Sequence, residues 1–286
     1  MIYELVLRVG AAQEIVVGGI LEELGAIAVT TELGPDPEEV VLRGLFYGML
    51  ESSVREIEIR LPLYFARFGL GLPAPVWREV VDCDWEKAWR AHSQAVAVGE
   101  GLLVLPSWLE PPVGNRRVVL RVDPAMAFGS GSHPTTRGCL VALERRAHDG
   151  LLGRTLDLGC GSGILAIAAA KLGAVSVLAT DIDPIATATC IENCGLNQVS
   201  GQVITRTQGG VPGGVFDTVV ANILANVLLE LAPDIVRVLA PGGNLILSGL
   251  LETHVEAILG TYDGLGMTGW NVDILEEWAV LGAFRG

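Results

Sequence analysis

One stretch of the sequence, residues 156–170, constrains the fold more than any other. It begins Leu-Asp-Leu-Gly-Cys-Gly-Ser-Gly and continues as an apolar run over residues 164–170. This order predicts a buried strand, a glycine-rich turn and a helix, an arrangement that holds nucleotide-like ligands at the start of the helix. Gly159, Gly161 and Gly163 lack a Cβ where the backbone must approach a ligand closely or take a positive φ. We therefore expect these three glycines to bind a cofactor.

A turn that is merely rich in glycine is the alternative, because the chain contains 36 glycines. The spacing also identifies the ligand more closely. The dinucleotide fingerprint requires a third small residue where this chain has Ile164. This departure disfavours a nicotinamide dinucleotide and favours another adenosine ligand.

The sequence after residue 154 alternates between strand and helix patterns. Strands are expected over 155–158, 175–180, 202–206, 216–221 and 244–248, with helices that begin near 164, 184, 226 and 253. This alternation predicts an α/β fold in which helices cover both faces of a parallel sheet, with ligands at the carboxyl ends of the strands. The runs 270–276 and 278–284 are too close for a crossover helix, so they predict a hairpin with one antiparallel strand.

The first 82 residues show a different order of elements. Strands are expected over 2–9, 26–31, 39–47 and 76–81, and helices over 11–24 and 54–68, the second one kinked or shortened by Pro62. The βαββαβ order is typical of a small α+β ferredoxin-like domain. We predict this domain over 1–82, a helical linker over 83–94 in which Trp85 and Trp89 stack, and a second domain over 95–286 that opens with strands over 96–105 and 118–122.

Composition limits the class of protein. Half of the 286 residues are hydrophobic and 18 % are charged, which allows a sizeable core. Apolar runs fall short of the roughly 18 residues of a membrane helix, and residues 1–4 lack a basic region, so we expect a cytoplasmic protein without a membrane partner. The five cysteines form no C-x-x-C pair and the four histidines have no ligand spacing, so a reducing compartment and no metal site are expected.

The formal net charge of −14 argues against a general nucleic-acid binder, whose affinity depends on neutralised phosphates. An acidic surface attracts cationic partners such as lysine-rich proteins, although it also serves solubility alone.

Two acidic residues lie near the glycine-rich turn. Asp181 ends the next predicted strand, 22 residues after Gly159, where its carboxylate can accept hydrogen bonds from ribose hydroxyls. A helix N-cap is the alternative role, but Asp183 suits that role better because it precedes Pro184. Asp157, which we place inside the turn, either orders the backbone or faces the amino-acid end of the ligand.

A second special stretch, residues 128–136, has the sequence Phe-Gly-Ser-Gly-Ser-His-Pro-Thr-Thr. It predicts a polar loop that covers a ligand, or a capped helix start in which Thr135 or Thr136 caps the helix and also contacts ligand. His133 has either a structural role or a role in proton transfer. Ser130 and Ser132 are poor nucleophile candidates because no G-x-S-x-G sequence occurs.

Asn222 ends the fourth of the strands predicted after residue 154. A lone Asn after an apolar strand is often only a turn residue. Its place at the carboxyl edge of the sheet, beside the glycine-rich turn, favours an amide that faces the substrate.

Together these motifs resemble a known family. The turn with Asp181 resembles the Rossmann-like class I S-adenosylmethionine-dependent methyltransferases, and the C-terminal hairpin resembles their reversed last strand. Residues 84–89, 127–136, 181–184 and 221–224 narrow the resemblance to the PrmA family, which methylates the large-subunit ribosomal protein numbered eleven. The first 82 residues match that family in length and in element order.

The resemblance implies S-adenosylmethionine as the cofactor. It also implies trimethylation of lysine side chains and an N-terminal α-amine of the ribosomal protein, which the first domain recognises. We expect a monomer that acts on the free protein and does not contact nucleic acid. The implied catalytic residues are Asn222, Phe128 and Thr136. The predicted cofactor-binding residues are Thr135, Thr136, Asp157, Gly159, Gly161, Gly163, Asp181 and Asn222.

Methyl transfer is an in-line displacement, so catalysis is mostly alignment of a neutral amine. Asn222 can accept a hydrogen bond from that amine through its side-chain oxygen. Three alternatives stay open: a class I methyltransferase for another protein lysine or a small-molecule amine, a cofactor-binding module without turnover, and a nicotinamide dehydrogenase.

Overall fold

The computed structural model of the chain describes residues 2–26, 28–34, 36, 38–47, 51–80, 95–122 and 133–286. The described residues divide into two compact units, one within residues 2–80 and the other made of 95–122 and 133–286. The boundary expected at residue 82 and the helical linker expected over 83–94 lie outside the described residues. The domain limits 1–82, 83–94 and 95–286 therefore stay predictions.

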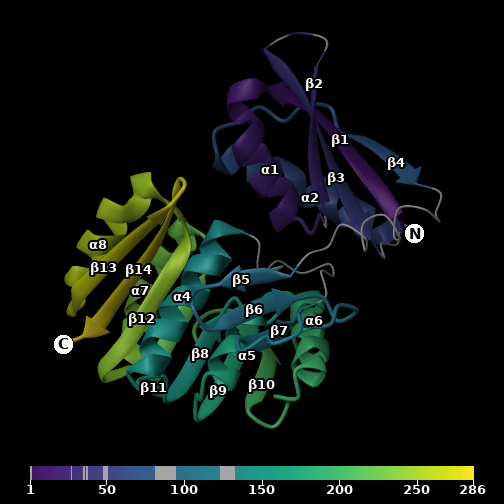
Figure 1. The fold of residues 1–286 in the computed structure, drawn as a ribbon. Coiled ribbons are helices and arrows are strands. Elements are labelled where there is room, and N and C mark those ends of the chain that lie inside the picture. The colour runs from purple at the N-terminus through teal and green to yellow at the C-terminus, as the bar shows by residue number, and fades with distance from the viewer. Residues whose placement is uncertain are drawn as a thin grey trace. The chain divides into compact units, whose positions relative to one another are not determined.

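The first unit has the predicted βαββαβ order. Its elements are β1 (Ile2–Gly10), the 3-10 helix η1 (Ala11–Gln13), α1 (Glu14–Glu23), β2 (Ala28–Leu33), β3 (Glu39–Tyr47), α2 (Glu51–Arg67) and β4 (Val76–Val80). The strands form an antiparallel sheet in the order β2-β3-β1-β4. Helices α1 and α2 cover one face of this sheet (Figure 1), where Leu5 and Leu42 of the strands pack against Ile20 of α1 and Phe65 of α2. The predicted ferredoxin-like arrangement is confirmed.

Helix α2 continues through Pro62 to Arg67, so of the two effects expected from the proline, a kink or a shortening, the shortening does not occur. A proline inside a helix costs about 3 kcal/mol because it removes one backbone hydrogen bond and crowds the preceding turn. Leu61 and Phe65, on either side of Pro62, are each only 1 % exposed. Burial of two such side chains contributes about 1.5 to 3 kcal/mol each, which offsets the cost of the proline.

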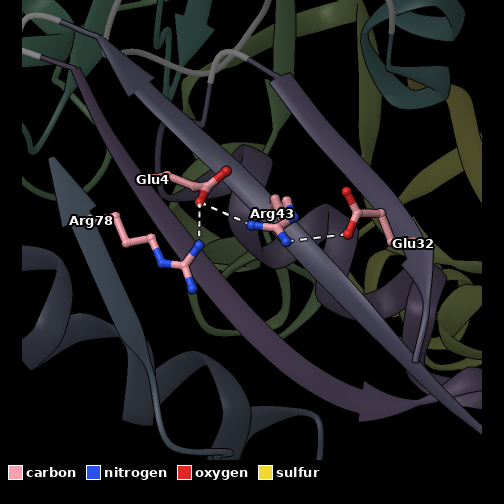
Figure 2. A network of polar contacts seen from close by, with 4 residues as sticks. All are labelled: Glu4, Glu32, Arg43 and Arg78. Carbon is pink, nitrogen blue, oxygen red and sulfur yellow. Dashed lines mark hydrogen bonds and ion pairs between the residues drawn. The ribbon is translucent and has the colours of Figure 1, made fainter. Parts of the chain in front are cut away.

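The opposite face of the same sheet carries an ion-pair network (Figure 2). Arg43 of β3 lies 3.1 Å from Glu4 of β1 and 3.2 Å from Glu32 of β2, and Arg78 of β4 lies 4.0 Å from Glu4. The network therefore links side chains of all four strands. Because its charges are partly exposed, each pair contributes only about 0 to 1 kcal/mol.

The second unit is built on a larger sheet. Its strands are β8 (Arg154–Leu158), β9 (Ser176–Asp181), β10 (Val203–Thr207), β11 (Phe216–Asn222), β12 (Leu239–Leu251), β13 (Met267–Leu275) and β14 (Trp278–Arg285). In the part of the chain that the structure describes, these form a seven-stranded sheet in the order β10-β9-β8-β11-β12-β14-β13. The pairs from β10 to β12 are parallel, whereas β14 is antiparallel to both neighbours. The predicted Rossmann-like sheet with a reversed C-terminal strand is confirmed.

Helices cover both faces of this sheet, as the alternating pattern predicts. They are α4 (Pro134–His148), α5 (Ile164–Lys171), α6 (Pro184–Leu196), α7 (Ala225–Val238), the 3-10 helix η2 (Glu252–His254) and α8 (Val255–Asp263). One core lies under α4, α5 and α6 and the other under α7 and α8 (Figure 1). Strand β8 lies between β9 and β11, so Gly159, Asp181 and Asn222 follow or end three adjacent strands at one sheet edge. Within the described residues, no helix is both long enough and apolar enough to cross a membrane.

The run over 96–105, predicted as one strand, is instead two antiparallel strands, β5 (Val96–Val98) and β6 (Leu102–Leu105). The turn between them contains Gly99, whose φ of +55° is a left-handed conformation. The carboxylate of Glu144 on α4 accepts hydrogen bonds from the backbone amides of Glu100 and Gly101 and so holds this turn. Strand β7 (Val118–Arg121) pairs parallel to β6 and completes a separate small sheet.

Candidate active site

The glycine-rich turn connects β8 to α5 as predicted. Gly159, Gly161 and Gly163 have φ values of +76°, +51° and +81°, which non-glycine residues rarely adopt. A Cβ on Gly159 would lie 2.3 Å from the side chain of Ile223, and one on Gly163 would lie 2.5 Å from Sγ of Cys190. Both the backbone conformation and the packing therefore require glycine.

Asp181 joins the end of β9 to this turn. Its Oδ2 accepts a hydrogen bond from the amide of Gly161 at 2.9 Å, and its Oδ1 accepts one from the amide of Asp183 at 3.0 Å. A carboxylate has about four acceptor positions, so each oxygen retains capacity for a hydroxyl group of a ligand. The N-cap belongs to Asp183, whose Oδ1 accepts from the amide of Ile185 at 2.8 Å ahead of Pro184, and this prediction is confirmed.

Asp157 lies within β8, not in the turn where we expected it. The side chain is fully buried, and its Oδ2 accepts a hydrogen bond from the amide of Ala166 in the first turn of α5 at 2.9 Å. Its Oδ1 has no hydrogen-bond partner among the described residues. Burial raises the pKa of this carboxyl well above its ordinary value. Of the two expected roles, the contact with Ala166 supports ordering of the backbone.

Asn222 meets the start of α4 at the carboxyl end of β11. Its Nδ2 lies 3.3 Å from Oγ1 of Thr135 and 3.5 Å from Oγ1 of Thr136, and both threonines are 1 % exposed. Its Oδ1 is buried and has no hydrogen-bond partner among the described residues. The structure thus brings three predicted site residues together and leaves one amide oxygen as an unused acceptor.

His133 is the N-cap of α4, with Pro134 as the first helical residue. Nδ1 of its ring accepts a hydrogen bond from the amide of Thr135 at 3.3 Å, so the expectation that Thr135 or Thr136 caps this helix was wrong. The proline explains the difference, because it fixes the first helical position and leaves the cap to the preceding residue. Burial lowers the pKa of His133 to about 4, which makes the ring a poor base at neutral pH. Phe128, Ser130 and Ser132 lie outside the described residues, so the role of Phe128 stays a prediction.

Comparison with known proteins identifies the family. The model of the PrmA family, described as ribosomal protein L11 methyltransferase, matches residues 2–285. The chain belongs to the PrmA family. The resemblance found in the sequence is therefore confirmed, and the dehydrogenase alternative is set aside.

Individual members of the PrmA family agree with this assignment. The ribosomal protein L11 methyltransferase of Geobacter metallireducens is 42 % identical over 235 residues, which are 81 % of this chain and 77 % of the relative. The ribosomal protein L11 methyltransferase of Geobacter sulfurreducens is 46 % identical over 235 residues, which are 81 % of this chain and 77 % of that relative. The crystal structure of ribosomal protein L11 methylase from Lactobacillus delbrueckii subsp. bulgaricus is 33 % identical, with a TM-score of 0.61, and covers 67 % of this chain and 97 % of that one.

The sequence reasoning missed two asparagines of this PrmA family member, Asn193 of α6 and Asn197, which is the C-cap of that helix. Nδ2 of Asn193 donates to the carbonyl of Ser162 in the turn at 2.9 Å. One helical turn later, Asn197 accepts from the amide of Arg121 and donates to its carbonyl, which ties β7 to α6. Their spacing of four residues places both on one helix face and was the available signal.

The cysteines of the described ranges, Cys139, Cys160, Cys190 and Cys194, are free and buried. Across those same ranges, no group of three or more His, Cys, Asp or Glu side chains is arranged to hold a metal ion. Cys190 and Cys194 are both buried on α6, in agreement with the shared helix face that a spacing of four residues gives.

Proposed function

We propose that this chain transfers methyl groups from S-adenosylmethionine to amines of ribosomal protein L11, specifically to lysine side chains and the N-terminal amine. The single observation that carries this proposal is the buried Oδ1 of Asn222, which has no hydrogen-bond partner in the part of the chain that the structure describes. It lies at the carboxyl end of β11, next to the strand that leads into the glycine-rich turn. Membership of the PrmA family supplies the substrate and the methyl donor.

The residues around the turn suit such a cofactor. The left-handed glycines expose backbone at the start of α5, and the Asp181 carboxylate has acceptor capacity for the two ribose hydroxyls. Ile182, which follows Asp181, is 77 % exposed and offers an apolar surface to an adenine ring. We infer that the turn, Asp181 and Ile182 hold the nucleoside part. When bound, the cofactor supplies an electrophilic methyl group on a sulfonium.

The protein's own part is to hold an amine that has already lost its proton. A lysine amine has a reference pKa of about 10.4, and an apolar pocket lowers it because burial disfavours the charged form. Oδ1 of Asn222 then accepts an N–H of the neutral amine and aims the nitrogen lone pair. His133, with a pKa of about 4, is not suited to act as a strong base at neutral pH, and no strong base is needed.

The two compact units suit a division of labour. We propose that residues 1–82 recognise the ribosomal protein, that 83–94 connect the domains, and that 95–286 carry out methyl transfer, with Phe128 and Thr136 beside the amine. The net charge of −14 favours a basic protein as the substrate. We further propose a cytoplasmic monomer that acts on the free protein before ribosome assembly, without contact to nucleic acid.

Mass spectrometry tests this proposal directly. Purified ribosomal protein L11 is incubated with the full chain and S-adenosylmethionine, and methyl increments are mapped to individual amines. A parallel incubation with assembled ribosomes distinguishes the free substrate from the assembled one. Methylation of free L11 at lysines and the N-terminus is expected; an unmodified protein alongside measurable cofactor binding would contradict the substrate assignment.

A further inference from the structure

The proposed role of Asn222 depends on which end of its amide faces the substrate. Oδ1 can accept a hydrogen bond from a neutral amine and direct its lone pair, whereas Nδ2 would compete with the methyl group for that lone pair. The two ends have nearly the same shape, so only their hydrogen-bond partners fix the orientation. The neighbours of Asn222 therefore decide whether the site is productive.

The orientation can be traced from a backbone group whose role is fixed. The amide of Thr135 is always a donor, and it points to Nδ1 of His133 at 3.3 Å. Nδ1 must therefore be the unprotonated ring nitrogen, which puts the proton of the neutral ring on Nε2. The low pKa of His133, caused by burial, agrees with a neutral ring.

The hydroxyl of Thr135 is the next link. Its Oγ1 lies 2.7 Å from the same Nδ1, and because that nitrogen accepts, the hydroxyl donates its only proton there. Oγ1 then has only lone pairs left for the side chain of Asn222, 3.3 Å away. Asn222 must present Nδ2 to Thr135, which leaves Oδ1 as the end without a partner among the described residues.

We propose that His133 and Thr135 are positioning residues that lock the Asn222 amide with its oxygen toward the substrate amine. The inference rests on the proposed function of Asn222. It assigns Thr135 to the orientation of the catalytic amide, a different role from the cofactor contact expected from the sequence. The edge-on contact between the rings of His133 and Trp278, with centroids 4.9 Å apart, holds the imidazole in this geometry.

Substitution of Thr135 tests the link. Thr135→Val keeps the shape but removes the hydroxyl, so the amide is free to turn, and kcat should fall by about tenfold to a hundredfold. Thr135→Ser restores the hydroxyl and should recover most of kcat. The affinity for S-adenosylmethionine, measured by calorimetry, should change by less than about threefold in both variants.

A matched control separates this effect from general destabilisation. Thr218→Val removes a different buried hydroxyl, which lies on β11 and donates to the carbonyl of Leu151 away from the site. It should lower thermal stability about as much as Thr135→Val but leave kcat unchanged. An equal loss of kcat in both variants would overturn the proposal.

A double-mutant cycle shows whether Thr135 acts through Asn222. In the Asn222→Ala background, Thr135→Val should cause no further loss of kcat, because there is no amide left to orient. Multiplicative losses would mean that Thr135 acts independently and would overturn the inference. Methylation of ribosomal protein L11 by the wild type is measured first. If the wild type does not methylate L11, the proposed function is wrong. If the wild type and Thr135→Val are equally active, only the positioning role of Thr135 is wrong.

His133 gives an independent readout. His133→Asn places an acceptor oxygen near the position of Nδ1 and should retain kcat within about threefold, whereas His133→Leu removes the acceptor and should behave like Thr135→Val. Nitrogen NMR of the imidazole in the wild-type protein should show the Nε2-protonated tautomer at neutral pH. A proton on Nδ1 would reverse the donor sequence and overturn the proposal.

Discussion

The carboxylate of Asp181 accepts a hydrogen bond from the backbone amide of Gly161 over 2.9 Å, although 20 residues separate them in the sequence. Its other oxygen accepts from the amide of Asp183. Asp181 therefore has two tasks under the proposed function: it holds the turn in place, and it offers its remaining lone pairs to the ribose. A substitution should reveal both tasks in one binding measurement.

Asp181→Asn should weaken S-adenosylmethionine binding by about tenfold or more, because an amide nitrogen replaces one acceptor oxygen and then opposes a backbone N–H. Isothermal calorimetry measures the effect. Asp183→Asn is the matched control, since Asn caps a helix as well as Asp does and should leave the affinity unchanged. Wild-type affinity in Asp181→Asn would mean that the carboxylate does not contact the cofactor.

Gly163→Ala should destabilise the protein by about 2 to 5 kcal/mol. The left-handed backbone costs an alanine about 1 to 2 kcal/mol, and its Cβ would collide with Cys190, which costs a further 1 to 3 kcal/mol. Gly173→Ala is the control, because Gly173 has a φ of +99° but no atom of the described residues lies within 4 Å of the position that a Cβ would take. The free energies of unfolding of the two variants, measured in urea, should differ only by the cost of the collision with Cys190. Equal free energies of unfolding would show that Cys190 moves aside freely.

Asn222→Ala should lower the rate of methyl transfer by about a hundredfold or more while S-adenosylmethionine still binds. The removed oxygen contacts the amine in the proposed mechanism, so the loss belongs to the transfer step. Single-turnover rates and calorimetry separate the two quantities. Asn244→Ala removes a buried amide that donates to the carbonyl of Leu151, and should lower stability without this loss of rate. A parallel drop in binding and rate for Asn222→Ala would remove the catalytic assignment.

Local sequence rules predicted those parts of the site that depend on neighbouring residues. The glycine-rich turn over 159–163 could be predicted because an apolar strand precedes it and an apolar helix follows it. Asp183 could be predicted as a helix cap because Pro184 follows it. The same rule, applied to Pro134, would have identified His133 as the cap of α4. The sequence therefore contains the signal for this cap.

Other parts of the site depend on contacts that no local pattern contains. Asn222 and Thr135 are 87 residues apart and meet only because α4 packs on the sheet near the end of β11. The contact between His133 and Trp278 likewise depends on the place of the reversed strand β14 beside β12. Side-chain partners of this kind follow from tertiary packing, so the sequence indicated the residues of the site and the structure supplied their connections.

Glu23 of the first unit should make stability depend on pH in an unusual direction. Its Oε2 is buried without a hydrogen-bond partner among the described residues. Burial raises the pKa of Glu23 to about 7, although the charges of Arg67 and Arg60 act to lower it. The folded state therefore binds this proton more tightly than the unfolded state, whose pKa is near 4.5. The contribution of the Glu23 proton to the free energy of unfolding is fully present below about pH 4.5. It is lost as the pH rises through 7, and the loss is about 3 kcal/mol at most.

Glu23→Gln tests this dependence, because the amide keeps the size of the side chain and cannot ionise. Urea unfolding at pH 8 should show the variant to be more stable than the wild type, whereas near pH 4.5 the two should be alike. Glu58→Gln, at an exposed position on α2, should leave the pH profile unchanged. Glu22, whose pKa burial also raises, stays in every variant, so a residual slope is expected. If the wild type and Glu23→Gln lose stability in parallel between pH 5 and 8, Glu23 is not the group that titrates.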